Sequence, residues 1–570
     1  MRAFSSPGIE VIFLKMKNQK YILGITAIML TIAGCSGDFL NRPPYGVLDE
    51  EDFFKTNDAG IKLVTSCYQP MLDGWGYSIN KVALGDEVVD NADAGGSDPG
   101  DRPQTTEVGR GRPLTSNPLL LECWSNRYTG IGKCNIALDA IAREGDNLVS
   151  GGVAIPQETV ARYLAEIRFL RAWYYFDLIT VFKEVPLVTT VEETATRKEK
   201  ATVAELREQL YSDLDAAIHE ANFPRLKQLA ESEAGRASKD AAYALKARAA
   251  LFFAGLMEQG KMDGDASAEY ALARTAAEEV VDHGGLSLLP DFQDLYRGDY
   301  QVGPFSSENI FGVLRDYNPA FGLGGDAFAI MNVGRNNIGG YGGNTPTRDL
   351  AASYNPTDPR KLFTIISHND IFRTSSGGQE VHNYQGYFND YNLQHSRKAF
   401  VPQQYRINND LLRSNWQPYW IRYAEVLLIY AEATLKSNGN TSEVVDKVNE
   451  VRRRAFVTTS KVDEPAIFRK FAADLKPITD GTFEAEYAVK ASDDLLAAIK
   501  RERRAELALE GLRLYDLIRW GDYAATMQSF YKTYGFADKG RDAGTDSWPF
   551  PIPQIEIDRS NGQLTQHSNY

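Results

Sequence analysis

The sequence contains few of the residues from which metal and catalytic centres are most often built. Its 570 residues include only four cysteines and six histidines. The cysteines do not have the paired spacing of a zinc site, and four are too few for a disulfide framework. The histidines show no metal-ligand spacing either. We therefore predict that the protein holds no metal and no cofactor.

Three cysteines, Cys67, Cys123 and Cys134, lie in the body of the chain. One disulfide between two of them is feasible in an oxidising compartment. We favour an interpretation as small buried core residues, because free cysteine is among the most often buried residue types. The sequence leaves their pairing open.

Common catalytic motifs are also missing. There is no HExxH metalloprotease motif and no GxSxG nucleophile elbow. Residues 322–327 match GxGxxA, but no helical period follows, so a turn is the better interpretation. Paired carboxylates for glycoside hydrolysis remain open, since 76 acidic residues offer many pairs and their separation depends on the fold. The sequence predicts a protein that is not an enzyme.

Basic residues are outnumbered, with 62 Lys and Arg against 76 Asp and Glu and a formal net charge of −14. Binding to a nucleic-acid backbone requires a basic surface. We therefore expect no nucleic-acid partner.

Long apolar runs are absent except near the N-terminus. A short basic segment beginning at Met16 precedes an apolar run at 21–33, which small residues follow up to Cys35. This order is typical of a secretory signal peptide. The segment 32–35 is similar to the lipobox of bacterial lipoproteins, so we expect a signal peptide at 1–34 and a lipidated Cys35. Residues 1–15 are interpreted as an over-extended start.

The body of the chain is dominated by helical periodicity. Segment 158–182 follows Pro156 and carries a wide apolar stripe at spacings of three and four, formed by Tyr163, Ile167, Leu170, Tyr174 and Leu178. Similar patterns recur at 203–221, 239–257, 266–283, 419–436, 443–454 and 493–519. Helices of this length joined by short links predict a mainly α fold of tetratricopeptide-like helix pairs. We expect one domain from 35 to 570, with a helical scaffold at about 46–285 and 415–530.

Two regions lack this period and are rich in Gly, Asn, Asp and Tyr, at about 73–117 and 286–414. A structureless loop as long as the second is improbable in a compact domain, so we predict short strands, turns and ordered loops. Loops carried on a rigid scaffold are where binding residues usually lie.

The acidic run at 90–101 could supply calcium ligands from Asp90, Asp93, Asp98 or Asp101. It lacks the spacing of an EF-hand, and a solvated turn is the interpretation that we favour.

The segment RERRAELALEGLRLYDLIRWG, at 501–521, combines charged and apolar residues in a helical pattern. If the helix continues, Leu507, Gly511, Leu514 and Ile518 share one face. Charge pairing among Arg503, Glu506 and Arg513 is then feasible along another side, and Gly511 suggests a close approach or a break. Because no nucleophile or metal motif accompanies these charges, we interpret the segment as scaffold.

Several ordered segments resemble one known family. ERRAELALEGLRLYDLIRWG resembles the C-terminal signature of the SusD/RagB family of outer-membrane nutrient-binding lipoproteins. CSGDFLNRPP, EEDFFKTNDAGIKLVTSCY, EIRFLRAWYYFDLITVFKEVPLV, RYAEVLLIYAEA and the tail beginning WPFPIPQIEIDRS are similar to its other segments. The last residues, at 567–570, depart from the family's usual ending.

This resemblance implies a mainly helical SusD-like fold with a lipid anchor in the outer membrane, facing the cell surface. It also implies a partner, a SusC-like TonB-dependent β-barrel that receives a captured oligosaccharide. Some lineages of the family bind peptides, and a peptide-binding protein is therefore the main alternative. A surface glycoside hydrolase and a purely structural helical scaffold are further alternatives.

A glycan ligand would require aromatic side chains for the apolar faces of its sugar rings and polar side chains for its hydroxyl groups. We expect the aromatic contacts from Trp75, Tyr77, Tyr317, Phe321 and Tyr341. Asn344 and Arg348 are the candidate hydrogen-bonding partners.

Overall fold

The computed structural model describes residues 53–54, 56, 58–96, 100–191, 193–194, 197–296, 306–312, 314, 327–332, 334, 340–367, 371–373, 379–381, 394–400, 418–457 and 478–570. The chain divides into two compact units. One groups the segment up to Ala59 with Asn147–Ala154, and the other comprises Gly60–Asp146 and Ile155–Tyr570. The expected single domain from 35 to 570 stays a prediction, and the signal peptide and Cys35 lie outside the described residues.

The first unit contains a small hairpin of β2 (Val149–Ser150) and β3 (Val153–Ala154). The Asp58 backbone N–H donates to the Val149 carbonyl at 3.1 Å. The Ser150 hydroxyl donates to the Asp58 carboxylate at 2.7 Å. These bonds fix the hairpin to the segment that precedes it.

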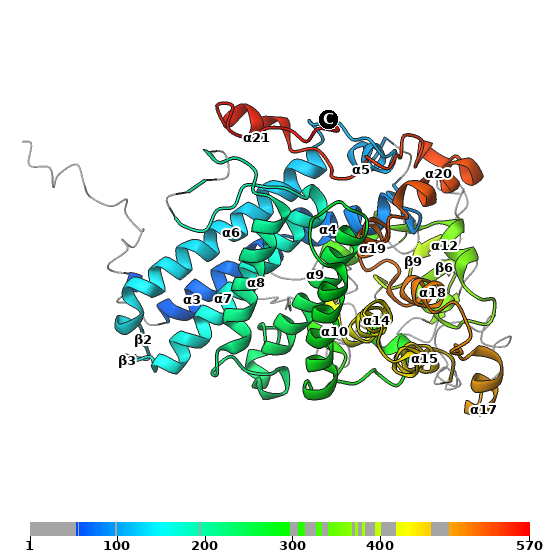
Figure 1. Ribbon diagram of the computed structural model, residues 1–570, viewed down its shortest axis with the longest axis horizontal. Coiled ribbons are helices and arrows are strands. Elements are labelled where there is room, and N and C mark those ends of the chain that lie inside the picture. The colour runs from blue at the N-terminus through cyan, green and yellow to red at the C-terminus, as the bar shows by residue number, and fades with distance from the viewer. Residues whose placement is uncertain are drawn as a thin grey trace, which may run out of the picture. The chain divides into compact units, whose positions relative to one another are not determined.

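The second unit is mainly helical, as the periodicity predicted. Its longer helices are α3 (Ala59–Tyr68), α6 (Pro118–Glu144), α7 (Gln157–Phe182), α8 (Val203–His219), α9 (Lys239–Glu258), α10 (Ala266–His283), α14 (Tyr423–Lys436), α15 (Thr441–Val457), α18 (Leu495–Leu507), α19 (Arg513–Trp520) and α20 (Tyr523–Tyr534). Consecutive helices pack in series from α6 through α10, then α14 and α15. Figure 1 shows α6, α7 and α8 running side by side. This serial packing is the arrangement expected of helix pairs.

Local sequence signals determine where these helices begin. The Asn117 side chain accepts hydrogen bonds from the first turn of α6, and Pro118 occupies its first position. Thr202 and Glu205 form a reciprocal capping box at the start of α8. Ser238 and Asp265 cap α9 and α10 by accepting hydrogen bonds from backbone N–H groups of the first turn.

Helix α7 is the centre of the core. It is buried on all sides from Phe169 to Phe182, which is more than a single apolar stripe predicts. The charges on this stretch are paired, with Arg171 contacting Asp213 at 2.7 Å and Asp177 contacting Lys81 at 2.5 Å. Neighbouring helices therefore surround α7 and satisfy its charges.

Short strands occur in the region at 286–414, as expected. They are β4 (Asn309–Phe311), β5 (Thr345–Pro346), β6 (Ile365–Ser367), β7 (Ile371–Arg373), β8 (Gln379–Val381) and β9 (Gln394–Ser396), with β1 (Ala92–Asp93) and β10 (Ile421–Arg422) elsewhere. The antiparallel pairs are β1–β5, β4–β10, β6–β9 and β7–β8. Short helical pieces interleave with them, namely α11 (Ala327–Asn332), α12 (Arg348–Ser353), α13 (Arg360–Thr364) and η9 (Phe292–Tyr296).

The region at 73–117 differs from the expected loop. It contains the helical turns η3 (Gly74–Ile79), α4 (Asn80–Val82), η4 (Ala83–Glu87) and α5 (Pro103–Gly109), directly after η2 (Gln69–Leu72). Both η3 and η4 are π-helical. A π-helical turn carries an extra residue, so the regular period of 3.6 residues is lost from the sequence. The remaining pieces of the unit are α17 (Asp480–Thr482), α21 (Gln554–Arg559), η5 (Gly145–Asn147), η7 (Leu226–Gln228), η8 (Glu231–Glu233), η16 (Phe483–Tyr487) and η17 (Phe536–Asp538).

The stretch at 501–521 is two helices and not one. Helix α18 ends at Leu507 and α19 begins at Arg513, with Leu509 and Gly511 at positive φ between them. A Cβ added at Gly85 would lie 2.1 Å from the Gly511 carbonyl oxygen. The break suggested by Gly511 is confirmed, and the glycine pair lets the two backbones touch.

The charge pairing expected among Arg503, Glu506 and Arg513 is wrong, because each of these three side chains binds a different partner. Glu506 accepts from Arg422 at 2.7 Å, Arg454 at 2.6 Å and Arg360 at 3.0 Å. Glu506 is fully buried, and these three guanidinium groups lower the pKa of its carboxyl despite the burial. The partners of the other charges are Asp516 for Arg503 and Asp90 for Arg513. The network fixes β10, α13 and α15 to the end of α18.

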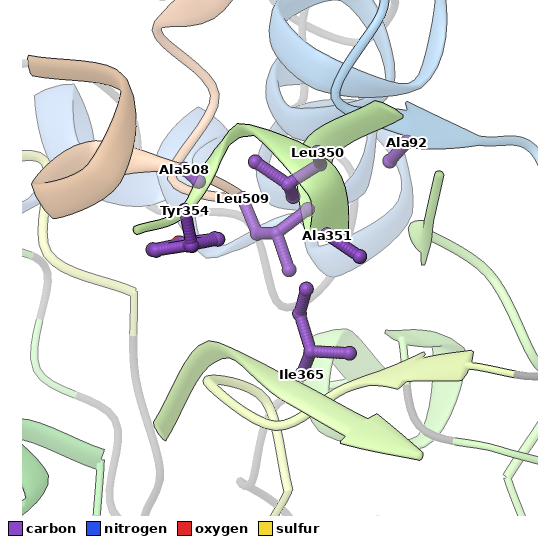
Figure 2. Close-up of a cluster of buried hydrophobic side chains, with 7 residues drawn as sticks. All are labelled: Ala92, Leu350, Ala351, Tyr354, Ile365, Ala508 and Leu509. Atoms are coloured by element: carbon purple, nitrogen blue, oxygen red, sulfur yellow. The ribbon is translucent and has the colours of Figure 1, made fainter. Parts of the chain in front are cut away.

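A hydrophobic cluster fixes the β1–β5 region to the same point of the scaffold. Figure 2 shows Leu350 of α12, Leu509 of the helix break and Ile365 of β6 directed toward one another. The cluster also contains Ala92, Ala351, Tyr354 and Ala508. Burial of this apolar surface holds the segment that follows residue 340 in place.

Candidate functional site

Two exposed aromatic side chains border the same short helix. Trp75 is 53% exposed and Tyr341 is 47% exposed. Trp75 lies on η3, which contacts α11. The Tyr341 backbone N–H donates to the Ile330 carbonyl of α11 at 2.7 Å. The structure therefore brings two of the sequence-predicted residues to one helix, although 266 positions of sequence separate them.

Local bonds hold the Trp75 segment in shape. The Asp73 carboxylate accepts from the backbone N–H groups of Trp75 at 3.1 Å and Gly76 at 2.9 Å. From α6, the Asn126 side chain donates to the Pro70 carbonyl at 3.1 Å, and Arg127 donates to the Gly76 carbonyl at 2.9 Å. The indole of Trp75 is thus presented on a backbone that is fixed on both sides.

The prediction that Tyr77 contacts the ligand is wrong, because Tyr77 belongs to the core. Its side chain is fully buried, and its hydroxyl donates to Asp177 at 2.9 Å. The Trp173 indole N–H donates to the same hydroxyl, and the Arg127 guanidinium lies 4.5 Å from the ring centroid. Burial raises the pKa of Tyr77 well above its usual range. In this conformation Tyr77 offers no face to a ligand.

Asn344 is buried too, but its environment is unusual. It has a φ of +46°, and its backbone N–H donates to Glu87 at 3.1 Å. Within the described part of the chain, neither atom of its side-chain amide has a hydrogen-bond partner. The amide oxygen of buried Asn332 at the end of α11 also lacks one among these residues. A buried polar group without a partner costs about 1–3 kcal/mol.

Asn332 and Asn344 are linked through a shared charged group. The Arg102 guanidinium donates to Glu87 and to the Ala94 carbonyl, each at 2.9 Å. A Cβ added at Gly343 would lie 2.8 Å from Arg102 Nη1 and 3.5 Å from the Asn332 amide oxygen. We call Glu87, Arg102, Asn332 and Asn344 the amide cluster. It adjoins the Tyr341 segment through Gly343 and Asn344, and its Asn332 amide oxygen and Asn344 amide group have no hydrogen-bond partner among the described residues.

Sequence reasoning missed three of these four residues. Glu87, Arg102 and Asn332 lie on separate elements, and no spacing in the sequence connects them. The one available signal was the glycine-rich stretch around Gly343, which permits the close approach of Arg102.

The remaining predicted positions lie apart from this cluster or outside the described residues. Arg348 is exposed at the first position of α12, where Thr347 caps the helix. Tyr317 and Phe321 fall outside the described residues. Trp75, Tyr341 and Arg348 therefore remain the exposed candidates.

The acidic run at 90–101 is engaged by basic side chains. Asp90 contacts Arg513 at 2.8 Å and Arg504 at 3.0 Å, and Asp93 contacts Lys539 at 2.6 Å. These arginines lower the pKa of Asp90. Asp98 lies outside the described residues, and within them no cluster of three or more potential metal ligands is present. Asp90 and Asp93 thus neutralise protein cations, which does not support the calcium alternative.

An open groove of about 770 Å³ lies elsewhere, along the first half of α8. Its described lining includes Lys198, Lys200, Glu205 and Glu208, and none of the described lining side chains is aromatic. Lys198 pairs with Glu193 at 2.6 Å, and Glu205 caps α8. The groove therefore lacks the aromatic surface that Trp75 and Tyr341 provide.

Among the described helices, none is both long and apolar enough to cross a bilayer.

Comparison with known proteins finds two family models and several relatives that match this chain. A family model described as "SusD family" matches residues 329–570, and one described as "Starch-binding associating with outer membrane" matches residues 114–251. SusD-like protein P2 of Formosa agariphila is 26% identical, covering 97% of this chain and all of that protein. A SusD-like protein of Bacteroides ovatus is 25% identical, covering 89% of this chain and 83% of that protein.

Solved structures have the same fold. Surface glycan-binding protein A from Bacteroides fluxus superposes with a TM-score of 0.69 at 22% identity, covering 90% of this chain and all of that one. Surface glycan-binding protein A from Bacteroides thetaiotaomicron, solved in complex with laminarihexaose, has a TM-score of 0.66 at 19% identity, with the same coverage. The mainly helical fold is therefore confirmed. From these matches, the chain is similar to SusD-family proteins along nearly its whole length.

Proposed function

We propose that this chain is a cell-surface lipoprotein that captures oligosaccharides and delivers them to a SusC-like TonB-dependent β-barrel, without hydrolysing them. The family description links relatives to starch binding and the outer membrane. Structural neighbours include a laminarin-binding protein and a complex with laminarihexaose. These are properties of the relatives, and they support the same class of ligand here.

The observation that carries the proposal is the pair of exposed aromatic side chains beside α11. The Trp75 indole is 53% exposed and the Tyr341 phenol is 47% exposed, so each offers a ring surface to a ligand. Sugar rings present flat apolar C–H faces that suit such side chains. Both aromatics lie on segments that the scaffold fixes, which limits the entropy lost when a ligand binds.

The amide cluster provides a second, polar component. Hydroxyl groups of a sugar both donate and accept hydrogen bonds, and so do the side-chain amides of Asn332 and Asn344. A small local opening would let a ligand hydroxyl, or a water molecule held by the ligand, form the missing hydrogen bonds with these amides. We assign to Arg348, exposed at the start of α12, a peripheral contact with the ligand.

The proposed route of oligosaccharide uptake also requires the lipid anchor and the transporter barrel. Cys35 would carry the lipid that tethers the protein to the outer membrane, and the helix-pair scaffold would support the ligand site above the barrel. If the full-length tagged lipoprotein is purified from outer membranes in mild detergent, we expect a TonB-dependent barrel to purify with it. Recovery of the lipoprotein alone would contradict this part of the proposal.

Substitution of the two aromatics tests the ligand site. We expect Trp75→Ala and Tyr341→Ala each to weaken oligosaccharide affinity by about 1–2 kcal/mol, roughly a five- to thirty-fold loss, because each removes one stacking surface. Calorimetric titration of the anchor-free chain, residues 36–570, with laminarihexaose and other soluble oligosaccharides measures this.

Leu114→Ala is the matched control, because Leu114 is 63% exposed and lies outside η3 and the segment at 341–348. Its affinity should equal that of the parent chain. Unchanged affinity in a folded Trp75→Ala Tyr341→Ala double variant would place the ligand elsewhere. Shortened oligosaccharide after prolonged incubation would instead support the hydrolase alternative.

A further inference from the structure

The segments that carry the two exposed aromatics have no basic side chain. Trp75 lies on η3 directly after η2, Tyr341 lies in the segment at 340–347, and both segments contact α11. Residues 69–79, 327–332 and 340–347 contain no lysine or arginine, and Asp73 is the single charged residue among them. Within these segments, the charge next to the candidate site is therefore negative.

The Asp73 carboxylate is exposed and has one oxygen available to a ligand. Its Oδ1 accepts from the backbone N–H groups of Trp75 and Gly76. Its Oδ2 accepts no hydrogen bond among the described residues. A Cβ added at Gly76 would lie 2.3 Å from Oδ2, so the glycine gives this oxygen room over the turn. Oδ2 is thus held beside the Trp75 segment with its capacity to accept unused.

A second exposed carboxylate lies on the side of Tyr341. The Gly96 backbone N–H donates to the carbonyl of Gly342, the residue that follows Tyr341, at 3.1 Å. A Cβ added at Gly96 would lie 2.7 Å from the Asp101 Cβ and 2.9 Å from its Oδ2. Asp101 is exposed. Each of the two aromatic segments therefore has an exposed carboxylate next to it.

The basic side chains near these segments leave this negative charge largely uncompensated. Arg102 pairs with Glu87 at 2.8 Å. Arg127 is buried and lies 3.7 Å from Asp177. Arg348, at the first position of α12, is the exposed cation of the candidate residues. Among the described residues, two exposed carboxylates thus adjoin the aromatic segments against this one exposed guanidinium.

We propose that Asp73 and Asp101 make the candidate site selective for uncharged oligosaccharides over those that carry carboxylate or sulfate groups. Asp73 also contacts the ligand, because its Oδ2 accepts a hydrogen bond from a hydroxyl of the sugar ring that lies on Trp75. Hydrogen bonds to an ionised acceptor are stronger than those between neutral groups. The inference rests on the proposed function, since it names the class of oligosaccharide that the same site takes.

Coulomb repulsion is the physical basis of the selectivity. Two like unit charges about 7 Å apart weaken binding by roughly three- to fifty-fold, for effective dielectric constants between about 80 and 20. An uncharged sugar of the same shape avoids this repulsion. Dissolved salt screens repulsion between exposed charges and leaves the steric fit of the ligand unchanged. The dependence of affinity on salt therefore separates exclusion by charge from exclusion by shape.

Matched pairs of ligands test the proposal. Laminarihexaose, cellohexaose and mannohexaose are each compared with the product in which the C6 hydroxymethyl groups are oxidised to carboxylates, so that backbone and linkage are kept. Each is titrated calorimetrically into the full-length protein in mild detergent, at about 20 mM and about 0.5 M salt. We expect at least one neutral form to bind at least about fivefold more tightly than its oxidised form at low salt. This ratio should narrow at high salt, while the affinity of the neutral form stays level.

The variant Asp73→Asn removes the charge and keeps the shape. Asparagine also caps helical turns, so η3 keeps its conformation, which circular dichroism and thermal unfolding verify. We expect the affinity for the neutral ligand to fall by about two- to fivefold and the ratio of neutral to oxidised affinity to fall by at least about threefold. The control Glu486→Gln removes an exposed carboxylate from η16, and both affinities should equal those of the parent chain.

Two results would overturn the selectivity and leave the proposed function standing. One is an oxidised form that binds as tightly as its neutral counterpart, or more tightly. The other is a preference for the neutral form that neither salt nor Asp73→Asn reduces, because it would then come from contacts with the C6 hydroxyl groups. An unchanged affinity of Asp73→Asn for the neutral ligand would overturn the direct hydrogen bond. Silence of the folded protein toward every ligand would count against the proposed function itself, and this inference would fall with it.

Discussion

The fully buried Glu506 is the residue on which most of the charge network depends. It contacts three arginines from three different elements, at distances between 2.6 and 3.0 Å. Removal of one partner from a buried ion pair leaves an uncompensated charge, which is more costly than loss of the pair. Glu506 therefore stabilises the fold by neutralising Arg360, Arg422 and Arg454.

We predict that Glu506→Gln lowers the free energy of unfolding by about 3–5 kcal/mol. The amide keeps the shape of the side chain but leaves three guanidinium groups with less negative charge. Denaturant titration followed by circular dichroism measures the change. The exposed Glu486 provides the control, and Glu486→Gln should change stability by less than about 0.5 kcal/mol. Equal stability of the two variants would contradict the role given to Glu506.

The same carboxylates predict sensitivity to acid. Arginines lower the pKa values of Asp90, Glu506 and Asp516 below their usual values of 3.8 to 4.5. A carboxyl whose pKa is lower in the folded state stabilises the protein above its unfolded pKa, and this stability is lost as the pH falls. We expect the thermal midpoint to fall by more than about 5 °C between pH 5 and pH 3. A midpoint that stays level over this range would show that these pairs contribute little.

The sequence could not predict which single side chains are exposed to solvent. Trp75 and Tyr77 are two positions apart in one glycine-rich segment, yet one is 53% exposed and the other is fully buried. The burial of Tyr77 depends on Asp177, Trp173 and Arg127, which come from distant helices. Composition indicated aromatic side chains in this segment, and only the tertiary contacts decide which of them reaches the solvent.

At the scale of elements, η4 makes a close backbone contact with the break between α18 and α19. A Cβ at Gly85 would overlap the Gly511 carbonyl. In α6, by contrast, a Cβ at Gly132 would meet no atom within 4 Å. Gly85 and Gly132 therefore differ in structural role, because of these two only Gly85 lies where two backbone segments touch.

We predict opposite effects for the two alanine substitutions. Gly85→Ala should destabilise the protein by about 1–3 kcal/mol or more, because the added carbon forces the backbones apart. Gly132→Ala should stabilise it by about 0.5–1 kcal/mol, because glycine is a poor helix former. Thermal unfolding of both variants measures the difference. A destabilisation of equal size in both variants would contradict the particular role given to the contact between Gly85 and Gly511.

Helical periodicity predicted the long helices because an amphipathic helix leaves a regular pattern in its sequence. It failed at 73–117, where π-helical turns disturb the period, and it continues unbroken through 508–512, where only Gly511 indicated the break between two helices. Both failures lie where distant segments meet. The contact of η3 with α11, on which the candidate site depends, likewise leaves no signal in local sequence.

At the scale of the whole molecule, the helix pairs form a scaffold and the irregular segments carry the candidate ligand site. The buried charge network and the cluster around Leu350 and Leu509 join these two parts. The family was accessible from the sequence because several ordered segments resemble it. The amide cluster was not, since its members come from separate elements and become neighbours only in the folded chain.

The central claim is that this SusD-like chain binds oligosaccharides at its surface. The most direct test is calorimetric titration of the anchor-free chain, residues 36–570, against a panel of soluble oligosaccharides that includes laminarihexaose, with peptides of mixed sequence as the alternative ligand class. The account predicts saturable binding to at least one oligosaccharide, with the ligand recovered intact and no response to the peptides. Saturable binding to peptides, together with silence across the oligosaccharides in a folded protein, would contradict it.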